Sequence, residues 1–100
     1  MPHLVLHHTA NLDGFDSDLA LAAANRALVD SGHFEDVAIK SRALALDHFR
    51  IGSADSGHGF VHATLKIMPG RSADIRAALG HAVHDALASC LPPLALHCQL

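Results

Sequence analysis

The stretch MPHLVLHH, residues 1–8, opens the chain with a proline that leads directly into the apolar run Leu4-Val5-Leu6. This run predicts a strand that begins at residue 2, which places the start of the chain inside the fold. If Met1 is removed, Pro2 becomes a free secondary amine at the head of that strand. Desolvation and nearby cations lower the pKa of an amine, and a neutral amine can act as a general base near pH 7. The alternative, which these eight residues alone favour, is that Pro2 only starts an edge strand.

The length of the chain predicts one domain over residues 1–100. The formal net charge of −3 argues against a nucleic-acid partner, which usually requires a clustered basic face. No apolar run approaches the roughly 18 residues of a membrane span, and no signal peptide is visible. Cys90 and Cys98 have neither disulfide-framework nor metal-ligand spacing, so we expect a cytoplasmic protein without a membrane partner.

Hydrophobic periodicity predicts two repeats of strand, helix and strand. The expected strands cover residues 2–8, 37–49, 60–67 and 94–100, and the expected helices cover residues 17–30 and 72–91. Asp16, Ser17 and Asp18 are expected to supply the N-cap and the first-turn negative charge of the first helix. Ser72 is the expected N-cap of the second helix, and Gly32 is the expected terminator of the first. Leu19, Ala22, Ala23, Ala27 and Leu28 are the expected apolar face of that helix. The expected apolar face of the second helix consists of Ile75, Leu79, Ala82, Val83, Ala86, Leu87 and Cys90.

Right-handed crossovers place both helices on one face of a four-stranded mixed sheet, which gives an α+β fold (α/β by some schemes). The other face is then open. It carries side chains such as Leu44, Leu46 and His62 and is a candidate surface for self-association.

Three cations are candidates for binding an anionic group. Lys40 and Arg42 lie two apart on one strand face, and Arg71 precedes the second helix. A cation at a helix N-terminus opposes the macrodipole, so Arg71 requires another reason for its position. His81 and His84 lie three apart on the second helix without a third ligand, so we expect no metal site.

Several motifs together resemble the 5-carboxymethyl-2-hydroxymuconate isomerase family of the tautomerase superfamily. They are Pro2-His3, SGHF at 31–34, IKSR at 39–42, FVHATLKIMPGRS at 60–72 and LALHCQL at 94–100. The likeness spans nearly the whole chain, and its most specific part is FVHATLKI followed by GRS.

The resemblance implies a homotrimer of tautomerase-like subunits that uses no metal or organic cofactor. It implies isomerisation of an unsaturated enol carboxylate in aromatic catabolism, as in breakdown of homoprotocatechuate, with Pro2 as the catalytic base. Arg71 then resembles a carboxylate-binding cation, and Lys40 and Arg42 are further expected substrate-binding residues. Position 40 is Arg in the family pattern, and Lys40 keeps the charge but loses the planar fork that binds a carboxylate twice.

Two alternatives stay open at this point. The chain could be a non-catalytic trimer of the same fold that binds an anionic small molecule, which Lys40 favours. It could also be a different tautomerase, such as a dehalogenase or a decarboxylase.

Overall fold

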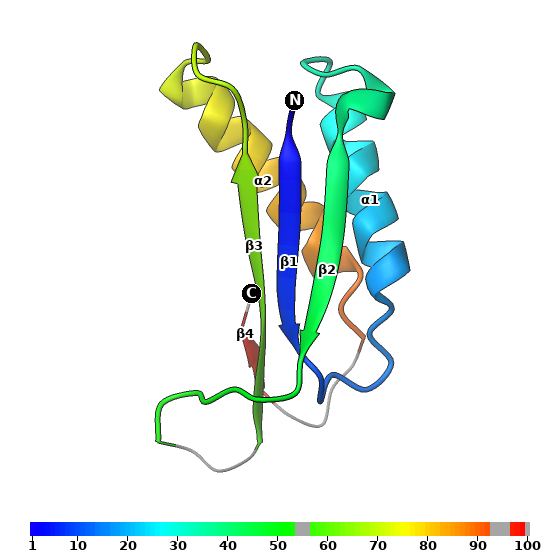
Figure 1. Cartoon of the computed structure of the whole chain (residues 1–100), viewed down its shortest axis with the longest axis vertical. Coiled ribbons are helices and arrows are strands. Elements are labelled where there is room, and N and C mark those ends of the chain that lie inside the picture. Colours follow the sequence, from blue (N-terminus) through cyan, green and yellow to red (C-terminus); the bar gives the residue numbers. More distant parts are fainter. Residues whose placement is uncertain (54–56, 93–96, 100) are drawn as a thin grey trace.

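The computed structural model describes residues 1–53, 57–92 and 97–99. Its elements are β1 (His3–Thr9), α1 (Ser17–Asp30), the 3₁₀ helix η1 (Asp36–Ala38), β2 (Lys40–Leu46), β3 (His58–Lys66), α2 (Ala73–Ser89) and β4 (His97–Gln99). Both helices lie across the same face of the sheet, as Figure 1 shows, and the opposite face carries no helix. The predicted α+β class and the placement of both helices on one face are thus confirmed.

The sheet is organised around β1. The strand order is β2-β1-β3-β4, with β1 parallel to β2 and antiparallel to β3. Within the described residues, β4 pairs with β3 in parallel through residues 97–99, at one edge of the sheet. The prediction of a four-stranded sheet is therefore met only in part, because the strand expected over 94–100 has three described residues. Residues 94–96 and 100 lie outside the described part.

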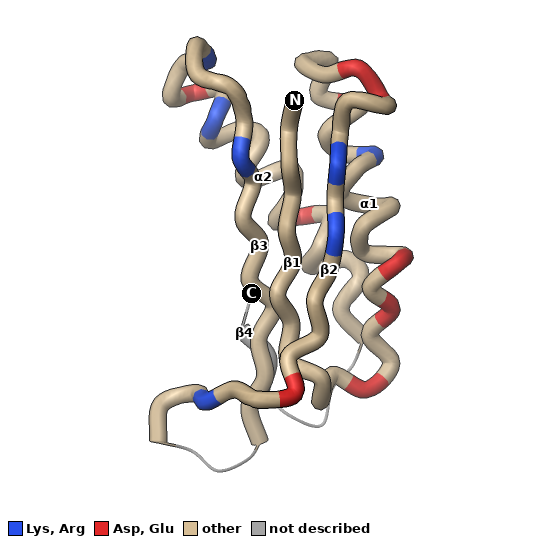
Figure 2. Tube along the Cα trace, in the orientation of Figure 1, with Lys and Arg blue, Asp and Glu red and all other residues tan. Residues whose placement is uncertain are grey.

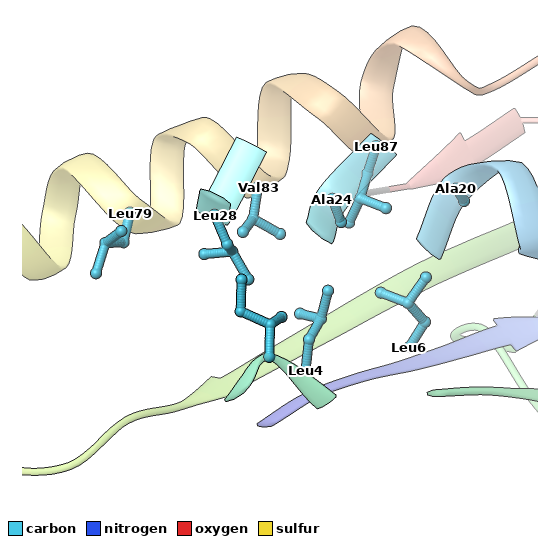
Figure 3. Packing of buried hydrophobic residues seen from close by; sticks show 9 residues of the cluster. Leu4, Leu6, Ala20, Ala24, Leu28, Leu79, Val83 and Leu87 are labelled. Carbon is cyan, nitrogen blue, oxygen red and sulfur yellow. The ribbon is translucent and has the colours of Figure 1, made fainter. Parts of the chain in front are cut away.

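The hydrophobic core lies between the sheet and the two helices (Figure 3). Its buried members are Leu4, Leu6, Ala20, Ala24, Leu28, Ile39, Leu79, Val83 and Leu87. In α2 the buried leucines and Val83 recur every four residues, as the sequence predicted.

The expected apolar face of α1 was only partly right, because Leu28 is buried as expected but Ala20 and Ala24, which were not in the predicted set, complete the buried face. Ala20, Ala24 and Leu28 face the core, whereas Leu19 is 63% exposed. Alanines on the buried face have no side chain beyond Cβ, so they allow close packing of the helix backbone against its neighbours. The larger Leu19 falls about 100° away on the helix and remains in solvent.

Asp16, one of the three candidates at the start of α1, is the N-cap of that helix, and the expected N-cap of α2, Ser72, is confirmed. The Asp16 carboxylate accepts hydrogen bonds from the backbone N–H groups of Asp18 and Leu19, at 3.0 and 3.2 Å. The Ser72 hydroxyl accepts one from the N–H of Ile75 at 3.2 Å. Gly32 follows the end of α1 with φ of 79°, a conformation that glycine adopts without steric cost.

The second strand is shorter than the predicted range of 37–49. Residues 36–38 form η1, with N–H groups of Ala38 and Ile39 bonded to the carbonyls of Glu35 and Asp36. This turn leaves Val37 79% exposed, and pairing with β1 begins only at Lys40. The third strand starts earlier than the predicted residue 60, because His58 and Gly59 pair with β4.

Gly59 provides a stability test at the base of β3. A Cβ added there would lie 2.7 Å from a Leu12 methyl and 2.8 Å from the Thr9 hydroxyl oxygen, which accepts a hydrogen bond from Phe60 N. Gly59→Ala should therefore lower the free energy of unfolding by about 1–3 kcal/mol, measured by urea denaturation.

Gly80, in α2, is the matched control because a Cβ there meets nothing within 4 Å. Gly80→Ala should raise the free energy of unfolding by about 0.5–1 kcal/mol through helix propensity. Equal effects of the two substitutions would contradict the packing described around Gly59.

Candidate functional site

Pro2 lies buried at the head of the central strand. Its side chain is less than 2% exposed, and its carbonyl accepts a hydrogen bond from Lys40 N at 3.0 Å. The alternation of β1 places Pro2 on the side of Leu4 and Leu6, which face the helices. Met1 is 64% exposed, so the bond between residues 1 and 2 lies at the surface while the ring beyond it is enclosed.

Arg71 links the start of α2 to the segment that follows α1. Its Nη2 donates a hydrogen bond to the carbonyl of His33 at 3.0 Å, and its guanidinium carbon lies 4.7 Å from the centre of the Phe34 ring. A guanidinium this close to an aromatic face makes a favourable cation–π contact. Arg71 is thus held at a fixed place, half-buried, with further N–H donors available to a ligand.

A cavity of about 560 Å³ lies where β3 leads into α2. Three cationic residues, Lys66, Arg71 and Arg76, are among its lining residues, together with the apolar Leu65 and Ile67. Figure 2 shows these cations gathered around the junction of the two elements. The volume is within the range of small-molecule sites, and the charge suits an anion.

The strand register brings this cavity to the level of Pro2. His3 pairs with Lys66, so one residue further along the two antiparallel strands Pro2 and Ile67 lie at the same level of the sheet. Pro2 does not itself line the cavity, whereas Ile67 does. The predicted base and Arg71 thus occupy the same end of the molecule.

Lys40 and Arg42 lie on the other face of the sheet. They pair with His3 and Val5 of β1, whose side chains alternate with those of Pro2 and Leu4. Arg42 Nη1 lies 3.2 Å from His3 Nδ1. Lys40 Nζ donates to the carbonyl of Val37. The structure therefore separates these two cations from Arg71, although sequence reasoning grouped all three.

Three residues at this end of the molecule were not named as candidate site residues in the sequence analysis. They are Phe34, Lys66 and Arg76, which contact or surround the same site as Arg71. Phe34 belongs to the SGHF motif, which was a signal of its importance. Arg76 had no such signal, because nothing in the sequence shows that the cavity curves from the strand end onto α2.

The histidine pair on α2 shows no metal-site geometry. His81 and His84 are exposed, and His84 Nδ1 lies 3.7 Å from a carboxylate oxygen of Asp85. Within residues 1–53, 57–92 and 97–99, no three metal-ligating side chains come together. No helix in these ranges is long and apolar enough to cross a membrane.

Comparison with known structures gives two similar proteins with an isomerase function. A 5-carboxymethyl-2-hydroxymuconate isomerase from Deinococcus radiodurans R1 is 29% identical with a TM-score of 0.82, covering 88% of this chain and 67% of its own. A 5-carboxymethyl-2-hydroxymuconate delta-isomerase is 25% identical with a TM-score of 0.81, covering 99% of this chain and 79% of its own.

A more distant match shows the fold alone. It is a fused 4-OT described as a symmetric trimer, 16% identical with a TM-score of 0.69, covering 98% of this chain and 83% of its own. No curated protein matches the sequence.

The family model for 5-carboxymethyl-2-hydroxymuconate isomerase matches residues 2–100. This match spans the strand that Pro2 heads, the connection that holds Arg71 and both helices. The chain therefore belongs to the 5-carboxymethyl-2-hydroxymuconate isomerase family of the tautomerase superfamily and is an isomerase.

Proposed function

We propose that this isomerase moves a proton within an unsaturated enol carboxylate without a cofactor, with Pro2 as the general base. The observation that supports this most is the position of Pro2, which is enclosed at the end of the central strand and level with a cation-lined cavity. The relatives named for 5-carboxymethyl-2-hydroxymuconate suggest the class of substrate, an enol that carries carboxylates. Aromatic catabolism and a cytoplasmic location remain predictions from the sequence.

The reaction requires one base and a cationic environment. The base takes the enol O–H proton, the double bonds shift, and the same proton is delivered to a carbon further along the conjugated system. Substrate and product have the same atoms and electrons, so no co-reactant is needed. Cations that hold the carboxylate and stabilise the developing enolate lower the barrier, and in this proposal Arg71 has that role.

The proposed role of Pro2 requires cleavage of the peptide bond between Met1 and Pro2. While Met1 is attached, the nitrogen of Pro2 is a tertiary amide without a basic lone pair. Removal of Met1 leaves a secondary amine at a buried position, still anchored by the hydrogen bond between its carbonyl and Lys40 N. The exposure of Met1 is compatible with such processing.

In this proposal Lys40 and Arg42 bind the substrate of a neighbouring copy in the assembly. They point away from the side of the sheet on which the Pro2 ring lies, so they would reach the site of a neighbouring copy. The open face also exposes Leu44 by 46%. Packing of open sheet faces in a homotrimer would cover this apolar surface.

Processing at Met1 gives the sharpest test of the base. Protein released with Pro2 as its first residue should isomerise phenylenolpyruvate or a muconate-type enol, followed by the loss of enol absorbance. The same chain with Met1 retained, verified by intact mass, should be slower by about 10²–10⁴-fold, the range for loss of a general base. Pro2→Ala in the processed form should be impaired as well, and full activity of either protein would contradict the assignment.

The contact between Phe34 and Arg71 gives a second test. Phe34→Leu removes the aromatic face under the guanidinium, a contact worth about 0.5–2 kcal/mol. The KM should rise about three- to tenfold while kcat changes less, because Arg71 then samples orientations that bind the carboxylate poorly. Phe49→Leu is the matched control, since Phe49 stacks edge-on with Phe60 at the far end of the sheet. An equal rise in KM in both variants would argue against a specific role for Phe34.

Sedimentation velocity tests the assembly. The wild-type protein should sediment with about three times the 10.5 kDa mass of one chain. Leu44→Asp places a charge on the open face and should shift the protein toward monomer. Leu19→Asp, on the exposed side of α1, should leave the assembly intact. A wild-type monomer at micromolar concentration would refute the proposed trimer.

A further inference from the structure

We infer that His3 is a positioning residue that holds Arg42 in place for the substrate of a neighbouring copy, and that it does so only as an uncharged imidazole. This inference deepens the proposed function and rests on it for the role of Arg42 in substrate binding. It assigns a role to the residue that directly follows Pro2 and that the proton transfer itself does not use.

The contact between His3 and Arg42 joins the neighbouring strands β1 and β2. Arg42 Nη1 lies 3.2 Å from His3 Nδ1, which is a hydrogen-bonding distance. Arg42 is exposed, and within the described residues this is the only hydrogen bond or ion pair of its guanidinium. A long exposed side chain otherwise samples many rotamers, so the contact with His3 restricts where the guanidinium lies.

The direction of this hydrogen bond determines the protonation state of His3. A guanidinium can only donate, so His3 Nδ1 is the acceptor. An imidazole that accepts at Nδ1 carries its proton on Nε2 and has no charge. A second proton, on Nδ1, would replace the acceptor with a donor and break the contact.

The charged groups that face His3 are all basic. Its partners across the sheet are Lys40 on β2 and Lys66 on β3, and Arg42 lies two residues beyond Lys40. On β1 itself the next residue on this face is the uncharged Val5, and both helices cover the other face. In the part of the chain that the structure describes, no carboxylate pairs with any of these cations.

Protonation of His3 would therefore add a fourth positive charge to the three on the flanking strands, which Figure 2 shows on either side of β1. Lys40 already has another partner, because its Nζ donates to the carbonyl of Val37. Arg42 is thus the cation whose position depends on the state of His3.

Two substitutions at His3 test the positioning role, both in protein that begins at Pro2. His3→Ala removes the acceptor and should raise the KM for phenylenolpyruvate about three- to tenfold at pH 8, the range for loss of one hydrogen bond, with a smaller change in kcat. His3→Asn keeps an uncharged acceptor near the position of Nδ1, so its KM should stay within about twofold of the wild-type value.

The pH dependence of the KM tests the requirement for an uncharged ring. Histidines gain their second proton between about pH 8 and 5, so the wild-type KM should rise about three- to tenfold over this range relative to that of His3→Asn, which does not titrate. His7→Asn is the matched control, because His7 lies on the same face of β1 but pairs with Leu44 and His62. It should keep the wild-type pH dependence, and thermal unfolding and sedimentation at both pH values check fold and assembly.

Nitrogen NMR tests the same point without turnover. In ¹⁵N-labelled protein at pH 8, His3 Nδ1 should have the chemical shift of an unprotonated ring nitrogen. A proton on Nδ1 at this pH would overturn the inference. So would equal KM values of the wild type and His3→Ala at pH 8, or a parallel rise in KM of the wild type and His3→Asn at low pH.

Arg42→Gln separates this inference from the proposed function. It should raise the KM, and His3→Ala should add less than about twofold in the double variant, because His3 acts through Arg42. A raised KM in Arg42→Gln with a wild-type KM in His3→Ala would overturn the inference alone. An unchanged KM in Arg42→Gln would remove the substrate role of Arg42 and the inference with it, while turnover that depends on the free Pro2 amine would still support the proposed base.

Discussion

The pairing of β1 on both of its edges is the constraint on which the rest of the structure depends. β1 bonds to β2 through residues 3–9 and to β3 through residues 3–8, while Leu4 and Leu6 are fully buried beneath the helices. Each backbone hydrogen bond adds only about 1 kcal/mol, but together with the buried leucines they fix the strand in one register. Because Pro2 directly precedes this strand, its position is fixed as well, whereas the first residues of most domains are poorly ordered.

Sequence reasoning succeeded where the signal was local. The caps at Asp16 and Ser72, the stop at Gly32 and the buried face of α2 follow from residue types at fixed spacing. It failed on the face of α1, because an alanine-rich helix offers several faces of similar hydrophobicity and only contact with the sheet decides between them. The shortening of β2 has the same kind of origin, since the turn of η1 competes with strand pairing near Val37.

The same distinction applies to the candidate site, where individual residues could be named from the sequence but the contacts between them could not. Pro2 and Arg71 were singled out from the sequence, but the contact of Arg71 with Phe34 joins residues far apart in the chain. The net charge of −3 also concealed an uneven distribution of charge, because acidic residues lie around the start of α1 and in the segment that follows it, whereas cations lie on β2 and around the cavity (Figure 2). The net charge of the whole chain cannot reveal such a pattern, and a cavity with cationic residues in its lining coexists here with an acidic chain.

The position of Arg71 now has a physical explanation. A cation at the start of α2 opposes the dipole of that helix, which costs a few tenths of a kcal/mol. However, its guanidinium reaches the carbonyl of His33, just beyond the C-terminal end of α1, where no basic residue occupies the last turn. The unfavourable interaction with α2 is thus offset by a favourable one with α1 and with the Phe34 ring. This hydrogen bond uses one donor of the guanidinium, so the contact that explains the position of Arg71 leaves its other N–H donors free of that carbonyl.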